Sequence, residues 1–552
     1  MGLLGRLRGR GGGPGGGGRG PLPALAREPE GSWFAAQSRF RAARWYPLEG
    51  DVGAGLAPGR LDLLGGVADF SGAQVLQCPT AKLKTLVSVA SRRVVGPEAW
   101  AELGGGGDGA DGGVVLLLES KSDPAMGGLG ALRCCVPLDK LKGLPLHRAG
   151  AALRDEAASG CPPWAVYAVG SVLAFCMKAR WFPEESLFVE VLSTLPLGQG
   201  VSSSAALEVA TMKALAALTG IGLANPAKGL TEDRNIATLG QMVENFVVGA
   251  PCGIMDQIAC SCANYQPEVR PPLVPICCRP GELGPLTKLP KDVCVLGWPS
   301  GVRHDLAGPS KYMVARAATF MGKKIAEGLL AAMVADAGWL QAFKQRMGEG
   351  GIEPGQVDYV LQSVQALKFP VKYLTEISRN LLDEIEDRLP ATLSGADFLA
   401  AHGGVDDPLS RIEAGTEYPV RAAVRFAIHA HTQGNAALTM LNMLAQGKIG
   451  SDRVLERVGA FMGLQHQSYS DMGLGSPETD EIVGLALGLR EKGVWGARVG
   501  GGGCGGTVVV LCHRRAKKGL ARLMEQYFER KGLPDPRQSP AAGPSGVQIF
   551  IE

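Results

Sequence analysis

An apolar run at residues 187–195 passes directly into a glycine turn, three consecutive serines and a sequence with apolar residues at helical spacing. This order predicts a strand, a turn and the start of a helix. Gly198 and Gly200 allow the backbone to approach a ligand closely, and residues 202–204 place hydroxyls beside the free N–H groups of the first helical turn. Such a helix start favours an anion, most often a phosphate. A tight turn before a well-capped helix would give the same pattern, so this stretch alone leaves both interpretations open.

Two charged residues lie in a second segment, residues 56–76, where apolar, strand-like pieces flank a turn rich in glycine. The turn is expected to carry Arg60 and Asp69. Taken singly, each is more often a solvated loop charge. Together, on glycine turns next to buried strands, they indicate a site for a polar ligand.

A third segment, residues 240–257, contains two acids in apolar surroundings. Glu244 lies in a helix-like stretch and by itself would be an ordinary charge on a helix face. Asp256 follows a turn of glycine, alanine, proline and cysteine. An acid in such a stretch is costly unless it is paired or coordinates a ligand, so Asp256 is a candidate functional residue.

A glycine run at residues 500–506 formally contains the GxGxxG spacing of dinucleotide-binding proteins. That fingerprint must open a helix, whereas this run opens a β-branched strand at residues 507–511, so the dinucleotide interpretation fails. The P-loop sequence is absent from the chain as well. The glycines are expected to form a loop that approaches the phosphate turn closely.

The rest of the chain predicts two domains. A buried helix is expected near residues 164–178, because this uncharged stretch is too short to span a membrane. The proline-rich residues 266–291 predict a domain boundary or a long connection. A strand at 293–298, a helix from about Tyr312 and further long helices to about residue 489 should follow.

Composition favours a small-molecule ligand. The 552 residues are 46% hydrophobic and 20% charged, and a net charge of +3 gives no electrostatic reason to expect nucleic acid or a membrane as partner. Thirteen cysteines without paired CxxC units predict neither a zinc site nor a disulfide framework, which suits a cytoplasmic protein. Residues 1–30, rich in glycine and arginine, are expected to be a disordered tail. Its lack of acids up to residue 27 leaves plastid targeting open.

Three of these segments, in this order, resemble the signature motifs of the GHMP small-molecule kinases: residues 57–65, residues 196–206 and residues 499–507. Further segments resemble the galactokinase branch of that family, at residues 251–257, at residues 302–304 with Tyr312, and at residues 476–481. The resemblance spans about residues 33–512. It implies an α/β (α+β) fold of two domains, at 31–290 (similar to S5 domain 2) and 291–552 (ferredoxin-like and helical), with the active site between them.

One departure bears on the substrate. Galactokinases carry Gly-Glu-His-Thr-Asp-Tyr in the first motif, whereas this chain has Gly-Gly-Val-Ala-Asp-Phe at residues 65–70. The missing Glu and His are associated with the hydroxymethyl arm of galactose, and rejection of a sugar depends on such hydrogen-bond partners. L-arabinose keeps the ring configuration of galactose and lacks that arm. Residues 65–70, together with residues 243–253, resemble the plant-type L-arabinokinases. Those proteins usually carry a glycosyltransferase-like domain before the kinase.

The resemblance implies an ATP- and Mg2+-dependent sugar 1-kinase that makes L-arabinose 1-phosphate, as a monomer or weak homo-oligomer. Galactokinase is the near alternative and a non-catalytic sugar sensor the remote one. Asp256 would orient or deprotonate the anomeric hydroxyl, Arg60 would hold Asp256 ionised, and Mg2+ would bind Ser204 and Glu244. Arg303 and His304 could be functional or structural. The residues implied for ATP phosphates are Pro196, Gly198, Gln199, Gly200, Val201, Ser202, Ser203, Ser204 and Ala205, and those for the sugar are Gly66, Asp69, Gly253 and Tyr312.

Overall fold

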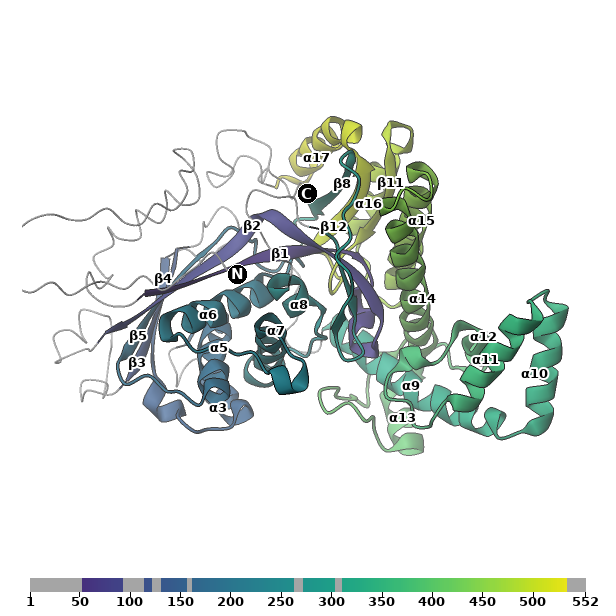
Figure 1. Cartoon of the computed structure of the whole chain (residues 1–552), viewed down its shortest axis with the longest axis horizontal. Coiled ribbons are helices and arrows are strands. Elements are labelled where there is room, and N and C mark those ends of the chain that lie inside the picture. Colours follow the sequence, from purple (N-terminus) through teal and green to yellow (C-terminus); the bar gives the residue numbers. More distant parts are fainter. Residues whose placement is uncertain are drawn as a thin grey trace, which may run out of the picture.

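Two larger β-sheets and the helices packed on them form the framework of the molecule (Figure 1). The structure is a computed structural model that describes residues 52–92, 114–121, 131–155, 161–262, 272–302 and 310–533. Helices and strands alternate along these residues, so the mixed α/β architecture expected from the sequence is confirmed. The N-terminal tail, residues 1–30, lies outside the described residues.

The first sheet has seven strands in the order β4-β3-β5-β2-β6-β7, with β1 paired to β2. All of its pairs are antiparallel except β3 with β5. Because β2 is long, β5 pairs with its second half and β6 with its first. The strands are β1 (Val52–Leu64), β2 (Gln74–Arg92), β3 (Val115–Lys121), β4 (Ala131–Pro137), β5 (Ser186–Ser193), β6 (Val274–Cys277) and β7 (Glu282–Leu283).

The structure revises two expectations about this sheet. Arg60, expected in a turn, lies within β1, and the turn that follows carries only Asp69, in the 3-10 helix η1 (Gly66–Ser71). The proline-rich stretch is more than a connection, because its described part contributes β6 and β7 to the sheet. The next strand, β8, belongs to the second sheet. The domain boundary near residue 290 stays a prediction.

Helices cover one face of the first sheet (Figure 1). Helix α6 packs directly against β1 because Gly53 and Gly55 have no side chain. A Cβ on either glycine would lie 2.0 Å from a carbonyl oxygen of α6. The predicted buried helix is confirmed as α5. The elements of this layer are η4 (Leu138–Leu141), α3 (Leu146–Arg154), α5 (Pro163–Ala179), α6 (Ser203–Thr219), η5 (Pro226–Lys228), α7 (Glu232–Met242), the π-helix η6 (Val243–Val248) and α8 (Met255–Ser261).

The second sheet has three antiparallel strands in the order β11-β12-β8. The strands expected at 293–298 and 507–511 are both confirmed. The strands are β8 (Val293–Pro299), β11 (Val494–Val499) and β12 (Thr507–His513), and the accompanying helices are α14 (Val420–Ala445), α15 (Ser451–Asp471), α16 (Pro477–Leu487), η9 (Arg490–Lys492), η10 (Arg514–Ala516) and α17 (Lys517–Lys531).

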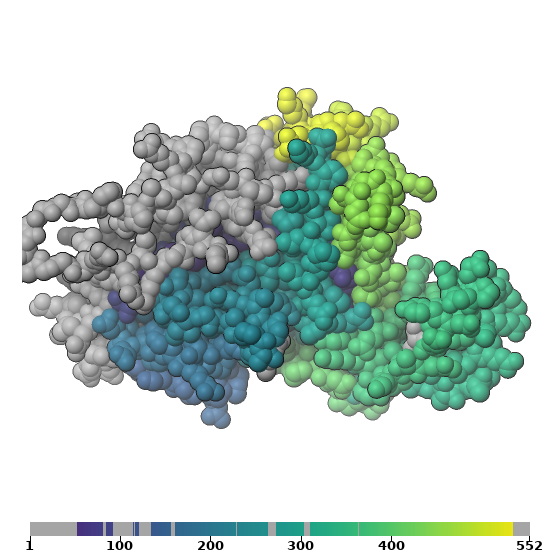
Figure 2. Space-filling view, in the orientation of Figure 1, coloured from purple at the N-terminus to yellow at the C-terminus, as the bar shows by residue number. Residues whose placement is uncertain are grey.

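Among the remaining helices, α10, α11 and α12 form a protrusion on the right of the molecule, with α10 at its end (Figures 1 and 2). A separate apolar cluster that includes Leu330, Phe343 and Leu382 holds it together. The helix expected from about residue 312 is confirmed as α9. The elements are α9 (Lys311–Val334), α10 (Ala337–Glu349), α11 (Pro354–Ala366), η7 (Leu374–Glu376), α12 (Arg379–Ile385), η8 (Glu386–Arg388), β9 (Leu393–Ser394), α13 (Gly395–His402) and β10 (Glu417–Tyr418).

The main apolar core joins the two sheets. It contains Leu61 of β1, Val209 of α6 and Val510 of β12, each at most 1% exposed. Burial of such side chains contributes roughly 1.5–3 kcal/mol each, so the two sheets are held by common packing. Among the described helices, none combines the length and the apolar character needed to cross a membrane.

Candidate active site

The phosphate turn, residues 196–202, leads from β5 to α6 by a left-handed backbone path. Gly198 and Gly200 have φ of 68°, and Ser202, directly before α6, has φ of 60°. This angle costs a serine on the order of 1–2 kcal/mol. The Ser202 hydroxyl makes no capping bond and is buried without a hydrogen-bond partner among the described residues. The interpretation as a well-capped helix is therefore wrong. The strained turn leaves the first N–H groups of α6 and a buried hydroxyl for a ligand.

The glycine loop at residues 500–506 lies against the phosphate turn, as expected from the sequence. Thr507 Oγ1 donates a hydrogen bond to the carbonyl oxygen of Gln199 at 2.7 Å. A Cβ at Gly501 would lie 3.1 Å from the carbonyl oxygen of Gly200. Two backbone segments some 300 residues apart in sequence thus approach one another closely, which requires the glycine.

Arg60 joins the phosphate turn to Asp256. Its Nε and Nη2 donate to the two carboxylate oxygens of Asp256, each at 2.9 Å, and its Nη1 donates to the carbonyl oxygen of Gly200. Arg60 is only 2% exposed, so it is not the solvated turn charge that its sequence context alone favoured. Burial acts to lower the pKa of Arg60, but Asp256 and then Asp62 outweigh it and leave that pKa above its usual value.

Two buried glutamates lie beside the start of α6. Ser204 Oγ donates to Glu244 Oε1 at 3.1 Å, and Gln257 Nε2 donates to Glu244 at 2.7 Å and to Glu208 at 3.2 Å. Glu208 is fully buried and Glu244 is 4% exposed. Ser204 and Glu208 are four residues apart on α6 and therefore share one helix face.

Burial dominates the electrostatics of this pair. It raises the pKa of Glu244 to about 7, with a further contribution from Asp256, while hydrogen bonds from Ser204 and Gln257 oppose the rise. Burial and the neighbouring Glu244 also raise the pKa of Glu208. A cation placed here would relieve the cost of burying two carboxylates.

The oxygen atoms at this point fit Mg2+. Mg2+ prefers hard oxygen ligands and usually takes one or two carboxylates together with substrate phosphates. The Ser204 hydroxyl and the Glu244 carboxylate supply such atoms beside the phosphate turn. Within the described ranges, no group of three or more His, Cys, Asp or Glu could form an all-protein cage. A site completed by phosphate oxygens therefore suits these residues better than a closed metal centre.

The residues expected to hold the sugar gather around Asp69 in η1. Gly253 lies so close that a Cβ there would be 1.9 Å from Asp69 Oδ2. Burial and then Asp256 raise the pKa of Asp69 to about 7, against bonds from the N–H groups of Phe70 and Met255 and the charge of Arg316. Tyr312, at the start of α9, is 8% exposed, and its ring centroid lies 6.4 Å from that of Phe70.

Arg316 supports this side of the site from α9. Its guanidinium stacks 4.8 Å from the centroid of the Phe70 ring and forms two hydrogen bonds with Asp407, at 3.0 and 3.2 Å. The pair orients the ring that follows Asp69. The sequence of the first motif did not indicate this contact, because Arg316 lies about 250 residues further along the chain.

The sequence-based prediction missed several residues of this centre. Asp62 accepts a hydrogen bond from Gly501 N at 3.1 Å and lies 3.3 Å from Nη1 of Arg498, and both side chains are fully buried. Sequence spacing could have identified Asp62, because residues two apart on a strand share a face and Asp62 lies two residues after Arg60. It could also have identified Glu208, which lies four residues after Ser204 on the predicted helix. No sequence pattern indicated Arg498.

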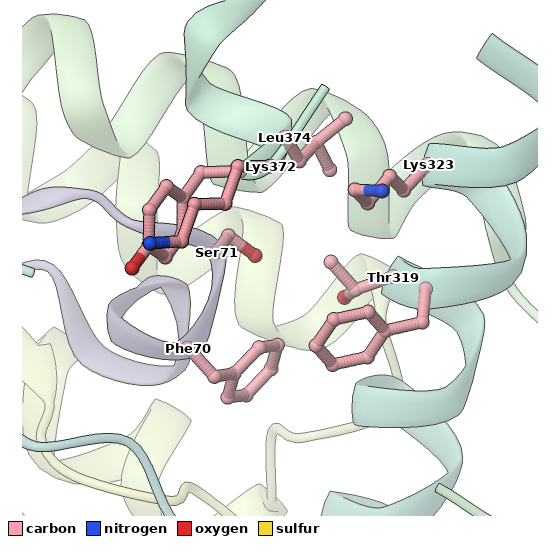
Figure 3. Close-up of a pocket in the computed structure, with 8 residues that line it drawn as sticks. Phe70, Ser71, Thr319, Lys323, Lys372 and Leu374 are labelled. Carbon is pink, nitrogen blue, oxygen red and sulfur yellow. The ribbon is translucent and has the colours of Figure 1, made fainter. Parts of the chain in front are cut away.

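A small hollow lies next to this centre, between η1, α9 and the segment around Leu374 (Figure 3). Phe70 and Ser71 line it together with side chains of α9, and none of the predicted site residues does. Ligand binding at the predicted centre therefore depends on the strained turn and the carboxylates rather than on this hollow. Arg303 and His304 lie outside the described residues.

Comparison with known proteins places this geometry in a family context. Residues 167–264 match the GHMP kinases N terminal domain, and residues 452–530 match the GHMP kinases C terminal domain. The first match contains the phosphate turn, Glu244 and Asp256, and the second contains the glycine loop at 500–506. The two matches therefore cover the phosphate turn, its neighbouring acids and the glycine loop, whereas Arg60 and Asp69 lie outside both.

Relatives include an L-arabinokinase from Arabidopsis thaliana, 29% identical over 529 residues, covering 92% of this chain and 48% of that protein. A galactokinase from Bos taurus is 25% identical over 507 residues and covers 91% of this chain and 95% of that protein. The chain thus spans about half the length of the L-arabinokinase. The crystal structure of Lactococcus lactis galactokinase complexed with galactose shares the fold, with a TM-score of 0.52 and 18% identity over 91% of this chain and 95% of that one.

Proposed function

The chain belongs to the GHMP kinases, and from this membership and the geometry of its site we propose that it is an ATP-dependent sugar 1-kinase. The reaction transfers the terminal phosphoryl group of ATP to the anomeric hydroxyl of L-arabinose and yields L-arabinose 1-phosphate and ADP. The phosphotransferase class agrees with the kinases among its relatives. The choice of L-arabinose goes beyond what 29% identity establishes and is the specific part of the proposal.

One observation carries the proposal: Arg60 contacts both halves of the site at once. It binds the carbonyl oxygen of Gly200 in the phosphate turn and both carboxylate oxygens of Asp256. A donor phosphate on the turn and an acceptor hydroxyl beside Asp256 would therefore meet at a single guanidinium. Phosphoryl transfer depends mainly on such positioning and on charge stabilisation.

The roles of the residues follow from this arrangement. The N–H groups at the start of α6 and the hydroxyls of residues 202–204 bind the phosphates of ATP. Asp256 accepts a hydrogen bond from the anomeric hydroxyl and is the carboxylate nearest to take its proton, as the bond to phosphorus forms and the bond to ADP breaks. Arg60 offsets charge on the transferring group. Mg2+, held by Ser204 and Glu244, supplies further positive charge at the phosphates when it is bound.

The sugar preference is inferred from residues 66 and 67. Gly66 and Val67 offer no polar side chain, so an additional sugar hydroxyl placed beside them would lose its bonds to water without gaining a partner. A pentose lacks this hydroxyl. Asp69, Gly253 and Tyr312 then hold the ring hydroxyls that remain.

The test is ATP-dependent turnover by the purified chain, with L-arabinose and D-galactose compared by kcat/KM. Because a polar group left without a partner costs roughly 1–3 kcal/mol, we expect a preference for L-arabinose of about tenfold or more. The Asp256→Asn variant should bind sugar and ATP but lose turnover.

Two other results would change the proposal. A preference for D-galactose would make the chain a galactokinase, an alternative in keeping with the galactokinases among its relatives. Binding of sugar without turnover in the parent chain would indicate a sensor and refute the proposed enzyme. Omission of Mg2+ and its replacement by Ca2+ test the metal requirement in the same assay.

We also propose a cytoplasmic location and a monomer or weak homo-oligomer. None of the thirteen cysteines, all of which the structure describes, forms a disulfide, which suits a reducing compartment. Size-exclusion chromatography at two protein concentrations tests the oligomeric state, and a fluorescent fusion to the full chain tests the location. Import into plastids would contradict the proposed location and assign a targeting role to the N-terminal tail.

A further inference from the structure

The backbone of the acceptor loop, residues 65–67, has no free N–H group. The N–H of residue 65 donates to Gln465 Oε1 at 2.9 Å, that of residue 66 to Asp62 Oδ1 at 3.2 Å, and that of residue 67 to the hydroxyl of Tyr469 at 2.9 Å. All of these bonds are buried. Each N–H group of the loop that precedes Asp69 is therefore bound by a protein side chain.

Two of the three side chains that accept hydrogen bonds from this loop belong to α15. Gln465 and Tyr469 are four residues apart and share one helix face, so they meet the N–H groups of alternate loop residues. Both side chains are at most 1% exposed. Helix α15 thus fixes, through two hydrogen bonds, the position of a loop that lies some 400 residues earlier in the chain.

Tyr469 also explains why residue 66 is glycine. A Cβ at Gly66 would lie 1.8 Å from the Tyr469 hydroxyl oxygen and 2.8 Å from Nη2 of Arg498. Contacts under 3.0 Å force a shift, and the Tyr469 hydroxyl cannot move without breaking its buried bonds. Gly66 also has φ of 52°, which favours glycine. The hydroxyl of Tyr469 therefore occupies the space that any side chain at position 66 would need.

The same hydroxyl links the acceptor loop to the loop beside the phosphate turn. While it accepts from the N–H of Val67, it donates to the carbonyl oxygen of Gly501 at 2.6 Å. The Arg498 guanidinium lies 5.1 Å from the centroid of the Tyr469 ring and fixes that ring from one side. One phenol thus sets the position of the acceptor loop relative to the phosphate turn.

We propose that Tyr469 is the positioning residue that sets the sugar preference. Its hydroxyl fills the space beside Gly66 and accepts the hydrogen bond of the Val67 N–H, so that this N–H cannot bind a sugar hydroxyl. The backbone of the acceptor loop therefore offers no free N–H group, and position 66 has no room for a polar side chain. It accepts a sugar carbon bearing hydrogen and disfavours one bearing a hydroxymethyl group. This inference rests on the proposed sugar kinase activity and adds the residue that determines its selectivity.

The first test is Tyr469→Phe, with Tyr527→Phe as a matched control. Both tyrosines are fully buried and donate one bond to a carbonyl oxygen, but Tyr527 contacts Ser300 and not the acceptor loop. Tyr469→Phe frees the N–H of Val67 for an additional sugar hydroxyl. We expect the kcat/KM ratio of L-arabinose to D-galactose to fall by about tenfold or more, mainly through the two KM values. Tyr527→Phe should leave the ratio unchanged, and an equal change in both variants would overturn the proposal.

The second test does not require activity. The thermal unfolding midpoints of the parent, Gly66→Ala, Tyr469→Ala and the double variant form a cycle. We expect Gly66→Ala to lower the midpoint by several degrees in the parent chain. In the Tyr469→Ala variant the same change should lower it by much less, because the clash with the hydroxyl is removed. Equal shifts in both backgrounds would refute the packing argument. Turnover of neither sugar by the parent chain would instead refute the proposed function and leave this cycle interpretable.

Discussion

The pairing of Arg60 with Asp256 gives the sharpest test of the site. Replacement of Arg60 by Met removes the hydrogen-bond donors that both oxygens of Asp256 have in the structure. Breaking a buried ion pair from one side costs about 3–5 kcal/mol, since a charge is left unpaired. The Asp256 side chain is 24% exposed, which admits water and favours the lower end, about 3 kcal/mol.

A double-mutant cycle separates this pair from general damage. Asp256→Asn removes the charge that Arg60→Met would strand, so the double variant should be less destabilised than the sum of the two single variants, by about 2 kcal/mol. Urea unfolding followed by circular dichroism measures each free energy. Additive effects within about 0.5 kcal/mol would refute the coupling.

Turnover supplies the second readout of the same variants. Loss of one preorganised charge-stabilising group typically lowers kcat by about 10²–10³-fold, and we expect this for Arg60→Met. The buried pair of Lys323 with Glu327, at 2.7 Å, serves as control because it lies outside the predicted site. Lys323→Met should lower stability without a comparable loss of kcat. Full activity of Arg60→Met would contradict the proposed role of the guanidinium.

Three further predictions concern the metal, the sugar and pH. Ser204→Ala should raise the Mg2+ concentration for half-maximal activity by about tenfold, whereas Ser204→Thr, which keeps the hydroxyl, should not; equal values would exclude a ligand role. Gly253→Ala should raise KM for the sugar and leave KM for ATP unchanged, because its Cβ would displace Asp69, while Gly328→Ala, in open space on α9, should add about 1 kcal/mol of stability. Burial raises the pKa of Asp69 from its ordinary value of 3.8 to about 7 in the folded state. The folded state therefore binds the extra proton, and stability falls as pH rises from about 4 to about 7, by at most about 4 kcal/mol. Asp69→Asn should flatten this slope in urea titrations at several pH values, and an unchanged slope would assign it to other groups.

Local features of the fold followed from the sequence wherever neighbouring residues decide them. The apolar run before the phosphate turn became β5, and the helical spacing after it became α6. The rejection of a dinucleotide fingerprint at residues 500–506 was correct as well, since that run opens β12. Periodicity and glycine content are read over short windows, and these elements are short-range structures.

The composition of the site was accessible only in part. Arg60, Asp256, Ser204 and Glu244 were named from their motifs, and the structure pairs Arg60 with Asp256 and Ser204 with Glu244. The burial of Arg60 was not accessible, because its sequence context indicates a turn charge until β1 and α8 enclose it. The absence of a cap at Ser202 could not be read either, because a serine before a helix usually caps it.

The order of residues along the chain indicated the segments of the site: a strand, a glycine turn and a helix for phosphates, and an acid in an apolar stretch for the acceptor. The strain of that turn and the groups that surround these segments became visible only in the folded molecule. Position 66 shows the difference most clearly, because the reason for its glycine is a hydroxyl on Tyr469, 403 positions later in the chain. Local backbone preference acts over a few residues, whereas the space and the partners available to a buried group depend on which distant elements pack against it.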